Sequence, residues 1–218
     1  FHAFLQLLFF RQWEALRSYA HQKSVSIIGD LPIYVSPDSA EVWGEPRLFQ
    51  LDEDLTLSAE AGVPPDAFSE LGQHWGNPLY DWDYHRRTGF AWWKRRCAHM
   101  ARLYDVVRID HFRAFHTYWS IPSGSQDART GHWEPGPGAA LLEALRPIEG
   151  LSLIAEDLGD LDDAARDFIA ESGLPGMKIL LYAFDPEGES AYLPHNCPVN
   201  AVAYTGTHDT PTFVQWLF

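Results

Sequence analysis

The stretch "DVVRIDHFRAF" (105–115) decides the fold, because it joins an apolar strand pattern to a cluster of charges. Val106, Val107 and Ile109 are β-branched, as suits a packed strand. Charged or titratable side chains crowd into the same few positions: Arg108, Asp110, His111 and Arg113. A buried carboxylate is costly unless it is paired and hydrogen-bonded. The stretch therefore predicts either a structural ion pair or an active site at the carboxyl end of a strand.

The composition narrows the classes of protein and of ligand. With 218 residues, 46% of them hydrophobic and 9 of them Trp, the chain predicts a globular domain with a substantial core. Its formal net charge of -14 argues against nucleic acid or an anionic membrane as a partner. No apolar run approaches the roughly 20 residues that span a bilayer. A neutral ligand fits better, and aromatic planes suit sugar rings.

The cysteines and the chain ends add two expectations. Cys97 and Cys197 are the only cysteines and form no Cys-x-x-Cys motif, which predicts free thiols in a reduced compartment. With no export signal visible, we expect a cytoplasmic protein. The chain starts and stops inside apolar patterns, "FHAFLQLLFF" (1–10) and "TFVQWLF" (212–218), so we expect a fragment of a longer protein. The oligomeric state stays open.

The order of predicted elements indicates an α/β fold. Helical spacing marks residues 1 to about 20 and 88–104, on either side of a short strand (24–30) and a long segment without clear periodicity (31–87). Strands and helices then alternate, which implies parallel βα units. The predicted strands are 105–110, 151–157, 177–184 and 201–207; the predicted helices are 139–146 and 161–171, and a loop covers 120–138.

Polar residues follow directly after four of these strands: Asp30; Asp110 and His111; Glu156 and Asp157; His208 and Asp209. A (β/α)₈ barrel carries its active site at the carboxyl ends of its strands. An open doubly wound sheet also binds ligands there. Because no Gly-x-Gly-x-x-Gly or Walker sequence follows any strand, the barrel is favoured, with five of its strands visible.

Three strand ends deliver three acids, which suits the cleavage of a glycosidic bond. That reaction needs one ionised carboxylate and one protonated carboxyl group in different environments. Arg108 shares a strand face with Asp110, so we expect it to keep Asp110 ionised. Glu156 follows the apolar run "LSLIA", which predicts the raised pKa of an acid catalyst. Asp209 would bind the hydroxyls of a distorted sugar ring.

Each of these residues also has a structural interpretation. An Arg-x-Asp sequence is more often an ion pair, and His208-Asp209 would serve equally well as a helix cap. Glu156-Asp157 is typical of a loop start, and Trp residues are more often core than sugar platforms. A metal site is a further alternative, because Asp110, His111, Asp157, His208 and Asp209 are good ligand types. No His-x-His or His-Glu-x-x-His spacing supports it.

Six segments resemble the 4-alpha-glucanotransferases (amylomaltases or disproportionating enzymes) of glycoside hydrolase family 77, relatives of the α-amylases. They are "IGDLPIYVSPDSAEVW" (28–43), "GVPPDAFSELGQHWGNPLYDW" (62–82), "VVRIDHFRAF" (106–115), "IAEDLG" (154–159), "PGMKILLYAFD" (175–185) and "YTGTHD" (204–209). They stand in family order along essentially the whole chain. Together they are far more specific than "RIDHFR" alone.

The resemblance implies a fold, a reaction and three roles. The fold is a single catalytic (β/α)₈ barrel, of which residues 1–218 hold about strands 3 to 7. The reaction is a retaining double displacement that moves α-1,4-glucan segments between maltodextrins, with no cofactor and no metal. Asp110 matches the nucleophile, Glu156 the acid/base and Asp209 the transition-state stabiliser. The partners would be a maltodextrin or α-1,4-glucan donor and acceptor.

The resemblance also implies substrate-binding residues: Asp30, Tyr34, Trp75, Asn77, Arg108, His111 and His208. Segment 31–87 would be a long insertion over the active site that excludes water and holds the acceptor by stacking. We expect Trp75 to be that platform; the alternative is a core Trp that anchors the insertion.

Three departures from the family pattern bear on these expectations. Ala67 stands before Phe68 where the family usually has Tyr, which removes an aromatic contact. Thr210-Pro211 replaces Asn-Asp after Asp209, and Pro in a helix's first turn is tolerated. The first two strands and the last strand of the barrel are absent, so we expect the isolated fragment to be unstable and inactive.

Three rival functions remain open. An α-amylase-like glucan hydrolase would use the same acids but release sugar to water. A metal-dependent barrel hydrolase would be inactivated by a chelator. A non-catalytic glucan-binding module would bind maltodextrin without needing Asp110 or Glu156.

Overall fold

The computed structural model describes residues 1–66, 69–159, 161–184 and 190–218. Its centre is a parallel sheet in the order β1-β4-β7, made of β1 (Ile28–Leu31), β4 (Val106–Ile109) and β7 (Leu153–Ala155). The register places the last residues of the three strands side by side, with Leu31 beside Ile109 and Ile109 beside Ala155. The side chains that follow these strands therefore meet at one edge of the sheet.

A second parallel pair continues along the chain, β8 (Gly176–Ile179) with β9 (Ala201–Tyr204). The Ala155 backbone N–H donates to the Pro175 carbonyl at 2.9 Å, which joins β7 to the segment entering β8. The predicted strand 177–184 ends at Ile179 and continues as a 3-10 turn (Leu180–Ala183). Within the described ranges these strands form an α/β fold whose sheets do not close into a barrel.

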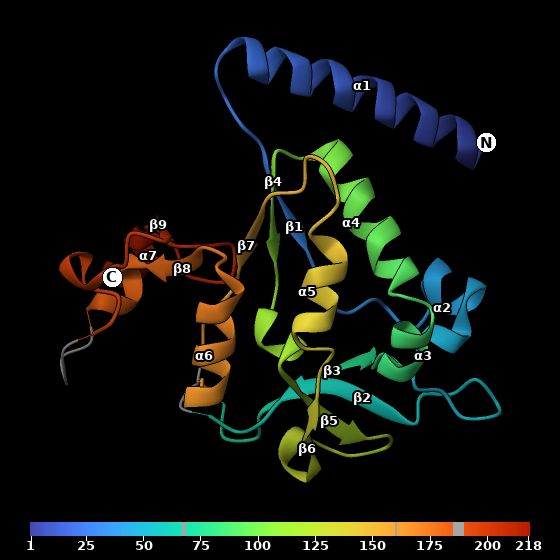
Figure 1. Ribbon diagram of the computed structural model, residues 1–218. Coiled ribbons are helices and arrows are strands. Elements are labelled where there is room, and N and C mark those ends of the chain that lie inside the picture. The colour runs from blue at the N-terminus through green and yellow to red at the C-terminus, as the bar shows by residue number, and fades with distance from the viewer. Residues whose placement is uncertain (67–68, 160, 185–189) are drawn as a thin grey trace.

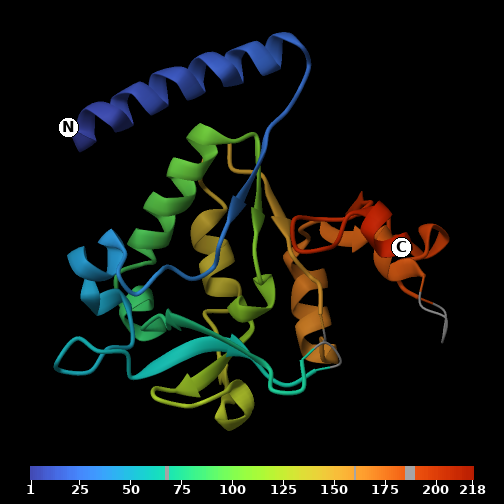
Figure 2. The same ribbon diagram turned by 180° about the vertical axis from the view of Figure 1, so that it is seen from behind.

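Helices α4 (Ala91–Leu103), α5 (Ala139–Leu145) and α6 (Asp163–Ser172) cover one face of the central sheet (Figure 1). The view from behind shows no helix of the described residues across the opposite face of β1, β4 and β7 (Figure 2). Buried side chains from the strands and helices form the larger hydrophobic core, including Val107, Ile109, Leu141 and Leu145. A second, smaller cluster around Ile154 and β8 is separate from it. The three helices confirm the predictions for 88–104, 139–146 and 161–171.

The segments expected to be loops form a second sheet instead. Residues 31–87 contain α2 (Ala40–Gly44), β2 (Ala59–Val63), β3 (Gln73–Pro78) and α3 (Trp82–Arg87). Segment 120–138 includes the end of β5 (Thr117–Pro122) and all of β6 (His132–Pro135). These strands pair antiparallel in the order β3-β2-β5-β6. The sheet lies beyond the carboxyl ends of β1 and β4 (Figure 1). The expectation of loops was wrong for the residues of these short strands. The strands are specified by pairing between two segments that are distant in sequence.

Most of the aromatic residues near this junction are structural. Tyr80, Trp82, Trp93 and Phe115 are each at most 6% exposed. Their rings contact one another edge-on, tilted or stacked at centroid distances of 5.0 to 6.4 Å. Such contacts add to the stabilisation from burial. For these residues the core interpretation of the aromatic content is confirmed.

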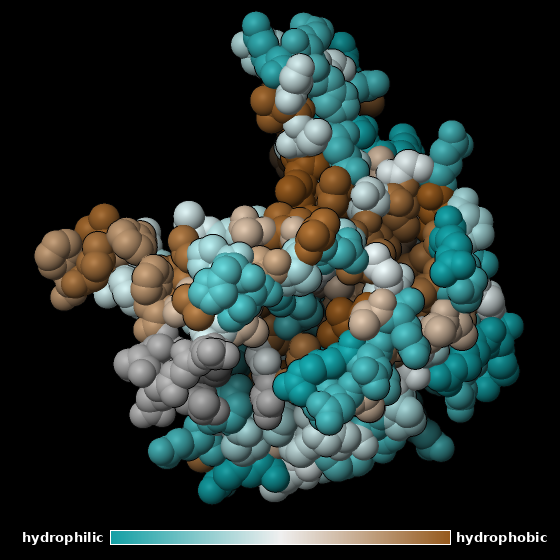
Figure 3. Space-filling model, turned by 60° about the vertical axis from the view of Figure 1, so that its left-hand side comes forward, coloured by the Kyte–Doolittle hydropathy of each residue, from teal (hydrophilic) through white to brown (hydrophobic). Residues whose placement is uncertain are grey.

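Helix α1 (His2–Gln22) confirms the predicted first helix but buries none of its residues. Its C-terminal half is anchored to the start of β4, because Arg17 pairs with Asp105 at 2.6 Å and Trp13 Nε1 donates to the Leu103 carbonyl at 2.9 Å. Hydrophobic surface lies beneath α1 in Figure 3. Exposed apolar side chains on the helix include Phe4, Leu5, Leu7 and Phe9. Among the described residues, no helix combines the length and apolarity needed to cross a membrane.

Candidate active site

Arg108 is the centre of an ion network at the end of β4. The residue is only 8% exposed. One guanidinium nitrogen contacts both carboxylate oxygens of Asp30 at 2.7 and 2.8 Å, and the other contacts Asp110 Oδ1 at 2.8 Å. Both carboxylates remain partly open, with about two-fifths of each side chain exposed. One buried cation therefore orients two acids that come from neighbouring strands.

The pKa of Asp110 is raised above its usual value. Burial is the largest cause; Arg108 opposes it, and the charges of Asp30 and Asp209 add to the increase. The predicted pair with Arg108 is present and, as expected, favours the ionised form of Asp110, although burial outweighs it in the direction of the pKa shift. Arg108 shares its charge with Asp30, whose carboxylate also repels that of Asp110.

Glu156 follows β7, and its carboxyl group is held by one backbone N–H after β4 and one after β7. Its Oε2 accepts from the His111 N–H at 2.7 Å and its Oε1 from the Leu158 N–H at 2.8 Å. The residue is 9% exposed. Burial raises its pKa to about 7, although the two backbone hydrogen bonds and Arg108 oppose the increase. The expected environment of an acid catalyst is confirmed for Glu156.

His111 directly follows Asp110 in the chain, and its ring contacts Trp75 of β3. Its backbone is left-handed, with φ 49°, which turns the chain sharply after β4. Burial lowers the pKa of its imidazole to about 4, so the ring is neutral near pH 7. Its ring meets the Trp75 indole edge-on at a centroid distance of 5.0 Å.

Asp209 lies on the loop after β9 and is held much more loosely. Its side chain is 64% exposed, and its Oδ1 lies 3.4 Å from His208 Nε2. Helix α7 (Phe213–Leu217) begins with Thr212 as a capping box, so the alternative that Asp209 caps this helix is wrong. Pro211 likewise precedes the cap rather than lying in the helix's first turn. Asp209 is therefore a loop residue with its carboxylate available.

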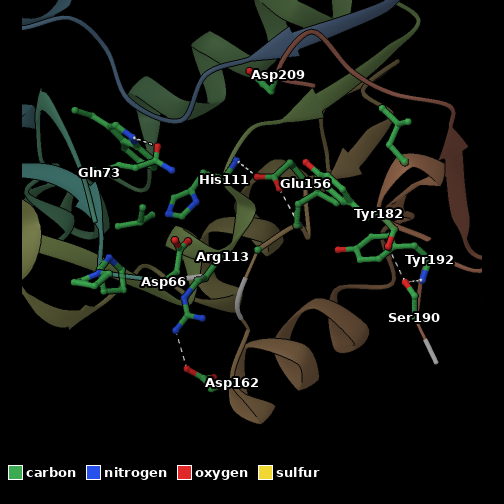
Figure 4. Close-up of a pocket in the computed structure, with 18 of the residues that line it drawn as sticks. Asp66, Gln73, His111, Arg113, Glu156, Asp162, Tyr182, Ser190, Tyr192 and Asp209 are labelled. Carbon is green, nitrogen blue, oxygen red and sulfur yellow. Dashed lines mark hydrogen bonds and ion pairs between the residues drawn. The ribbon is translucent and has the colours of Figure 1, made fainter. Parts of the chain in front are cut away.

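A cavity of about 1150 Å³ is lined by His111, Glu156 and Asp209. In Figure 4, His111 and Glu156 lie together at its centre, Gln73 and Asp66 on one side, Tyr182 and Tyr192 on the other, and Asp209 at a separate edge. Four predicted site residues line the cavity: Trp75, His111, Glu156 and Asp209. The remaining predicted residues are not part of its lining: Asp30, Tyr34, Asn77, Arg108, Asp110 and His208.

Trp75 has the environment expected of a platform. The residue is 36% exposed, and its Nε1 donates to Gln73 Oε1 at 3.0 Å, which fixes the indole. Tyr34 is 8% exposed and packs between Trp75 and Tyr80, at centroid distances of 6.2 and 6.0 Å. The structure therefore places Tyr34 as support for Trp75 rather than as an open surface.

Asn77 ties the second sheet to the segment after β1. Its Nδ2 donates to the Val35 carbonyl at 2.8 Å, so this part of its amide is occupied within the protein. Asp157 turns away from the cavity, because its carboxylate accepts from the Met177 N–H at 2.6 Å and lies 3.3 Å from Lys178 Nζ. Among the described residues, no group of three or more His, Cys, Asp or Glu could hold a metal ion.

The family model described as 4-alpha-glucanotransferase, glycoside hydrolase family 77, matches residues 1–218. The chain belongs to glycoside hydrolase family 77. Curated relatives named 4-alpha-glucanotransferase include those of Streptococcus pneumoniae, 47% identical over 217 residues, and Thermus thermophilus, 49% identical over 219 residues. These alignments cover 99% of this chain but 43% and 44% of the relatives. The chain thus spans less than half the length of the relatives it matches.

Solved structures agree with this assignment to glycoside hydrolase family 77. The amylomaltase from Streptococcus agalactiae in complex with acarbose superposes with a TM-score of 0.92 at 47% identity, covering 97% of this chain and 43% of that one. The amylomaltase from Corynebacterium glutamicum gives a TM-score of 0.82 at 25% identity, covering 95% and 29%. The resemblance inferred from the six sequence segments is confirmed.

In this family 77 chain, the cavity is also lined by Arg113, from the charged cluster noted in the sequence, and by residues that the sequence did not single out: Gln73, Trp133, Tyr182 and Tyr192. Tyr182 follows the end of β8, so the rule that functional side chains follow parallel strands would have found it. Trp133 and Tyr192 have no such signal, because they lie outside the parallel strands. The Ala67-Phe68 departure lies outside the described residues.

Proposed function

We propose that this chain supplies the catalytic centre of a 4-alpha-glucanotransferase that moves α-1,4-glucan segments between maltodextrins. One observation carries the proposal: two carboxyl groups at adjacent strand ends have different surroundings. Asp110 is paired with Arg108 and partly open. Glu156 is buried and has a pKa of about 7. Retaining glycosidases need this division between a nucleophile and an acid.

The reaction then follows in two displacements. The Asp110 carboxylate attacks the anomeric carbon of the donor while Glu156 gives its proton to the departing glycosidic oxygen. This leaves a glucosyl ester on Asp110 and an ionised Glu156. The ionised Glu156 next takes the proton from an acceptor hydroxyl, whose oxygen attacks the same carbon and releases Asp110. No other reactant is consumed, and Glu156 ends protonated as it began.

The other predicted residues have supporting roles in this proposal. Arg108 holds Asp110 and Asp30 in place. Neutral His111 and exposed His208 would contact substrate hydroxyls, and Asp209 would stabilise the charge that develops on the sugar ring. Trp75 would stack on the acceptor and displace water, which favours transfer over hydrolysis. Tyr34, packed between Trp75 and Tyr80, and Asn77, hydrogen-bonded to the Val35 carbonyl, would keep this wall rigid.

The sheets fit a (β/α)₈ barrel of which this chain contributes about strands 3 to 7. Two observations support this. Strands β1, β4 and β7 pair in parallel, as do β8 and β9, and helices α4, α5 and α6 cover one face of the central sheet. The exposed apolar side chains of α1, such as Phe4 and Phe9, fit a helix that packs against further chain. We therefore propose that the isolated fragment is unstable and inactive, and that the activity belongs to the longer protein. We also propose that this protein acts in the cytoplasm.

The deciding experiment uses this chain extended to the length of its relatives, called here the full-length protein. It is incubated with maltotriose while free glucose and longer maltodextrins are followed together. Glucose with longer products, both lost in Asp110→Asn, would support transfer. Shorter products alone would indicate a hydrolase, and inactivation by a chelator would indicate a metal-dependent enzyme. Maltodextrin binding without turnover would indicate a binding module.

A structure of that protein gives a geometric test. The carboxyl groups of Asp110 and Glu156 should lie roughly 5–5.5 Å apart if the enzyme retains configuration. A separation beyond roughly 6.5 Å is typical of inverting enzymes and would contradict the double displacement.

A further inference from the structure

Trp133 lines the same cavity as Glu156 but belongs to a different part of the molecule. It lies on β6, whereas Trp75 lies on β3, and these are the two outer strands of the four-stranded sheet. Three strand spacings correspond to roughly 14 Å between their backbones. Two cavity-lining indoles are thus set well apart, further than one sugar ring extends.

The Trp133 indole is fixed by its neighbours without being covered by them. The guanidinium carbon of Arg113 lies 4.0 Å from its ring centroid, within the range of a cation–π contact. Trp119 meets the ring at a centroid distance of 5.0 Å and an angle of 70°. Trp133 still keeps 39% of its surface exposed. A rigid aromatic side chain with open area loses little entropy when a ligand stacks on it.

The two residues that hold Trp133, Arg113 and Trp119, are each bound to another part of the chain. Arg113 is 6% exposed and contacts Asp162 Oδ2 at 2.7 Å. Asp162 caps α6, since its Oδ1 accepts from the Ala165 N–H at 2.8 Å. Trp119 Nε1 donates to the Ala128 carbonyl at 2.9 Å. A Cβ on Gly131 would lie 2.3 Å from Trp119 Nε1, so only glycine leaves room for this packing.

We propose that Trp133 is a second sugar platform, which binds a distal glucose unit of a chain whose scissile bond lies at Glu156. The inference rests on the proposed function and names the substrate class more closely, as glucans long enough to reach β6. A cavity of about 1150 Å³ exceeds the roughly 300–1,000 Å³ of typical small-molecule pockets, as several sugar units require. Trp133 therefore sets a preference for longer chains.

The test compares kcat/KM for maltoheptaose and for maltotriose in the full-length protein, with glucose as the acceptor. In Trp133→Ala the ratio of the two values should fall about two- to tenfold, the range for loss of one aromatic contact. Trp133→Phe keeps a ring and should recover part of the ratio. Trp43→Ala is the matched control, because Trp43 is 89% exposed on α2 and does not line the cavity.

The outcomes separate the two proposals. An unchanged ratio in Trp133→Ala, with the unmodified protein active, would overturn the role of Trp133 and leave the transferase proposal intact. An equal loss on both substrates that Trp133→Phe does not recover would also overturn it, because a purely structural role predicts that result. If the unmodified protein makes no longer products from maltotriose, the proposed function fails and this inference fails with it.

Discussion

The acids at the ends of β4 and β7 differ from the acid after β9 in how the chain holds them. Asp110 is fixed by buried Arg108, and Glu156 by two backbone N–H groups. Asp209 stands on a loop with 64% of its side chain exposed and its carboxylate 3.4 Å from His208 Nε2. The first two are held in place by the protein itself, as the proposed function requires of its reacting groups. Under the same proposal, Asp209 would be ordered by the sugar that it binds.

The largest expected effect is that of Asp110→Asn in the full-length protein. An amide cannot form the glucosyl ester, so kcat/KM for maltotriose should fall by about 10⁴-fold or more. Initial rates of glucose release measure it, with a melting curve to verify folding. A residual rate within tenfold of the unmodified protein would show that Asp110 is not the nucleophile.

Glu156→Gln should have the next largest effect on the rate, about 10²- to 10⁴-fold, because the departing oxygen loses its proton donor. It should also affect folding. A glutamine amide can accept only one of the two backbone N–H bonds now made to Glu156, so the free energy of unfolding should drop by about 1–3 kcal/mol. Denaturant unfolding beside the activity assay measures both. Full stability with lost activity would show that the bond lost in this variant contributes nothing to folding.

Asp209→Asn should lower kcat/KM by about 10²- to 10³-fold, as for loss of one stabilising group in the transition state. Its melting temperature should change by less than about 1 °C, since substitutions at exposed positions rarely affect stability. A pronounced drop in melting temperature would remove the contrast between this loop and the ends of β4 and β7. The measurement pairs differential scanning calorimetry with initial rates.

The pH dependence should show the smallest effect, roughly tenfold per pH unit. Glu156 must carry its proton to act, and its pKa is about 7, so kcat/KM should fall as pH rises above 7. A pH profile of kcat/KM on maltotriose measures this limb. The residual activity of Glu156→Gln should lack the limb. A limb that persists in Glu156→Gln would assign the ionisation to another group.

The sequence was informative where the signal was local. A carboxylate directly after an apolar strand predicted both the strand end and the site, and the raised pKa of Glu156 followed from the apolar run before it. The direction of the pKa shift of Asp110 could not be predicted in the same way. That shift is the net effect of burial and of the charges of Arg108, Asp30 and Asp209.

The four-stranded sheet and Trp133 were missed for a related reason. Strand β2 pairs with β5, with Ala61 opposite Ser120, about sixty positions away. Neither strand has a buried, continuous apolar pattern that marks it alone. Trp133 takes its position from the pairing of β6 with β5 and from its contacts with Trp119 and Arg113. Such features become visible when segments distant in sequence are brought together.

The pairing of β2 with β5 has a consequence for how this chain can be altered. The strands come from two separate insertions, one after β1 and one after β4, yet they share one hydrogen-bonded sheet. Replacing either insertion alone would leave the other with an unpaired strand edge. The two insertions therefore form a single exchangeable unit, and a chimaera with another family 77 protein should transplant both or neither.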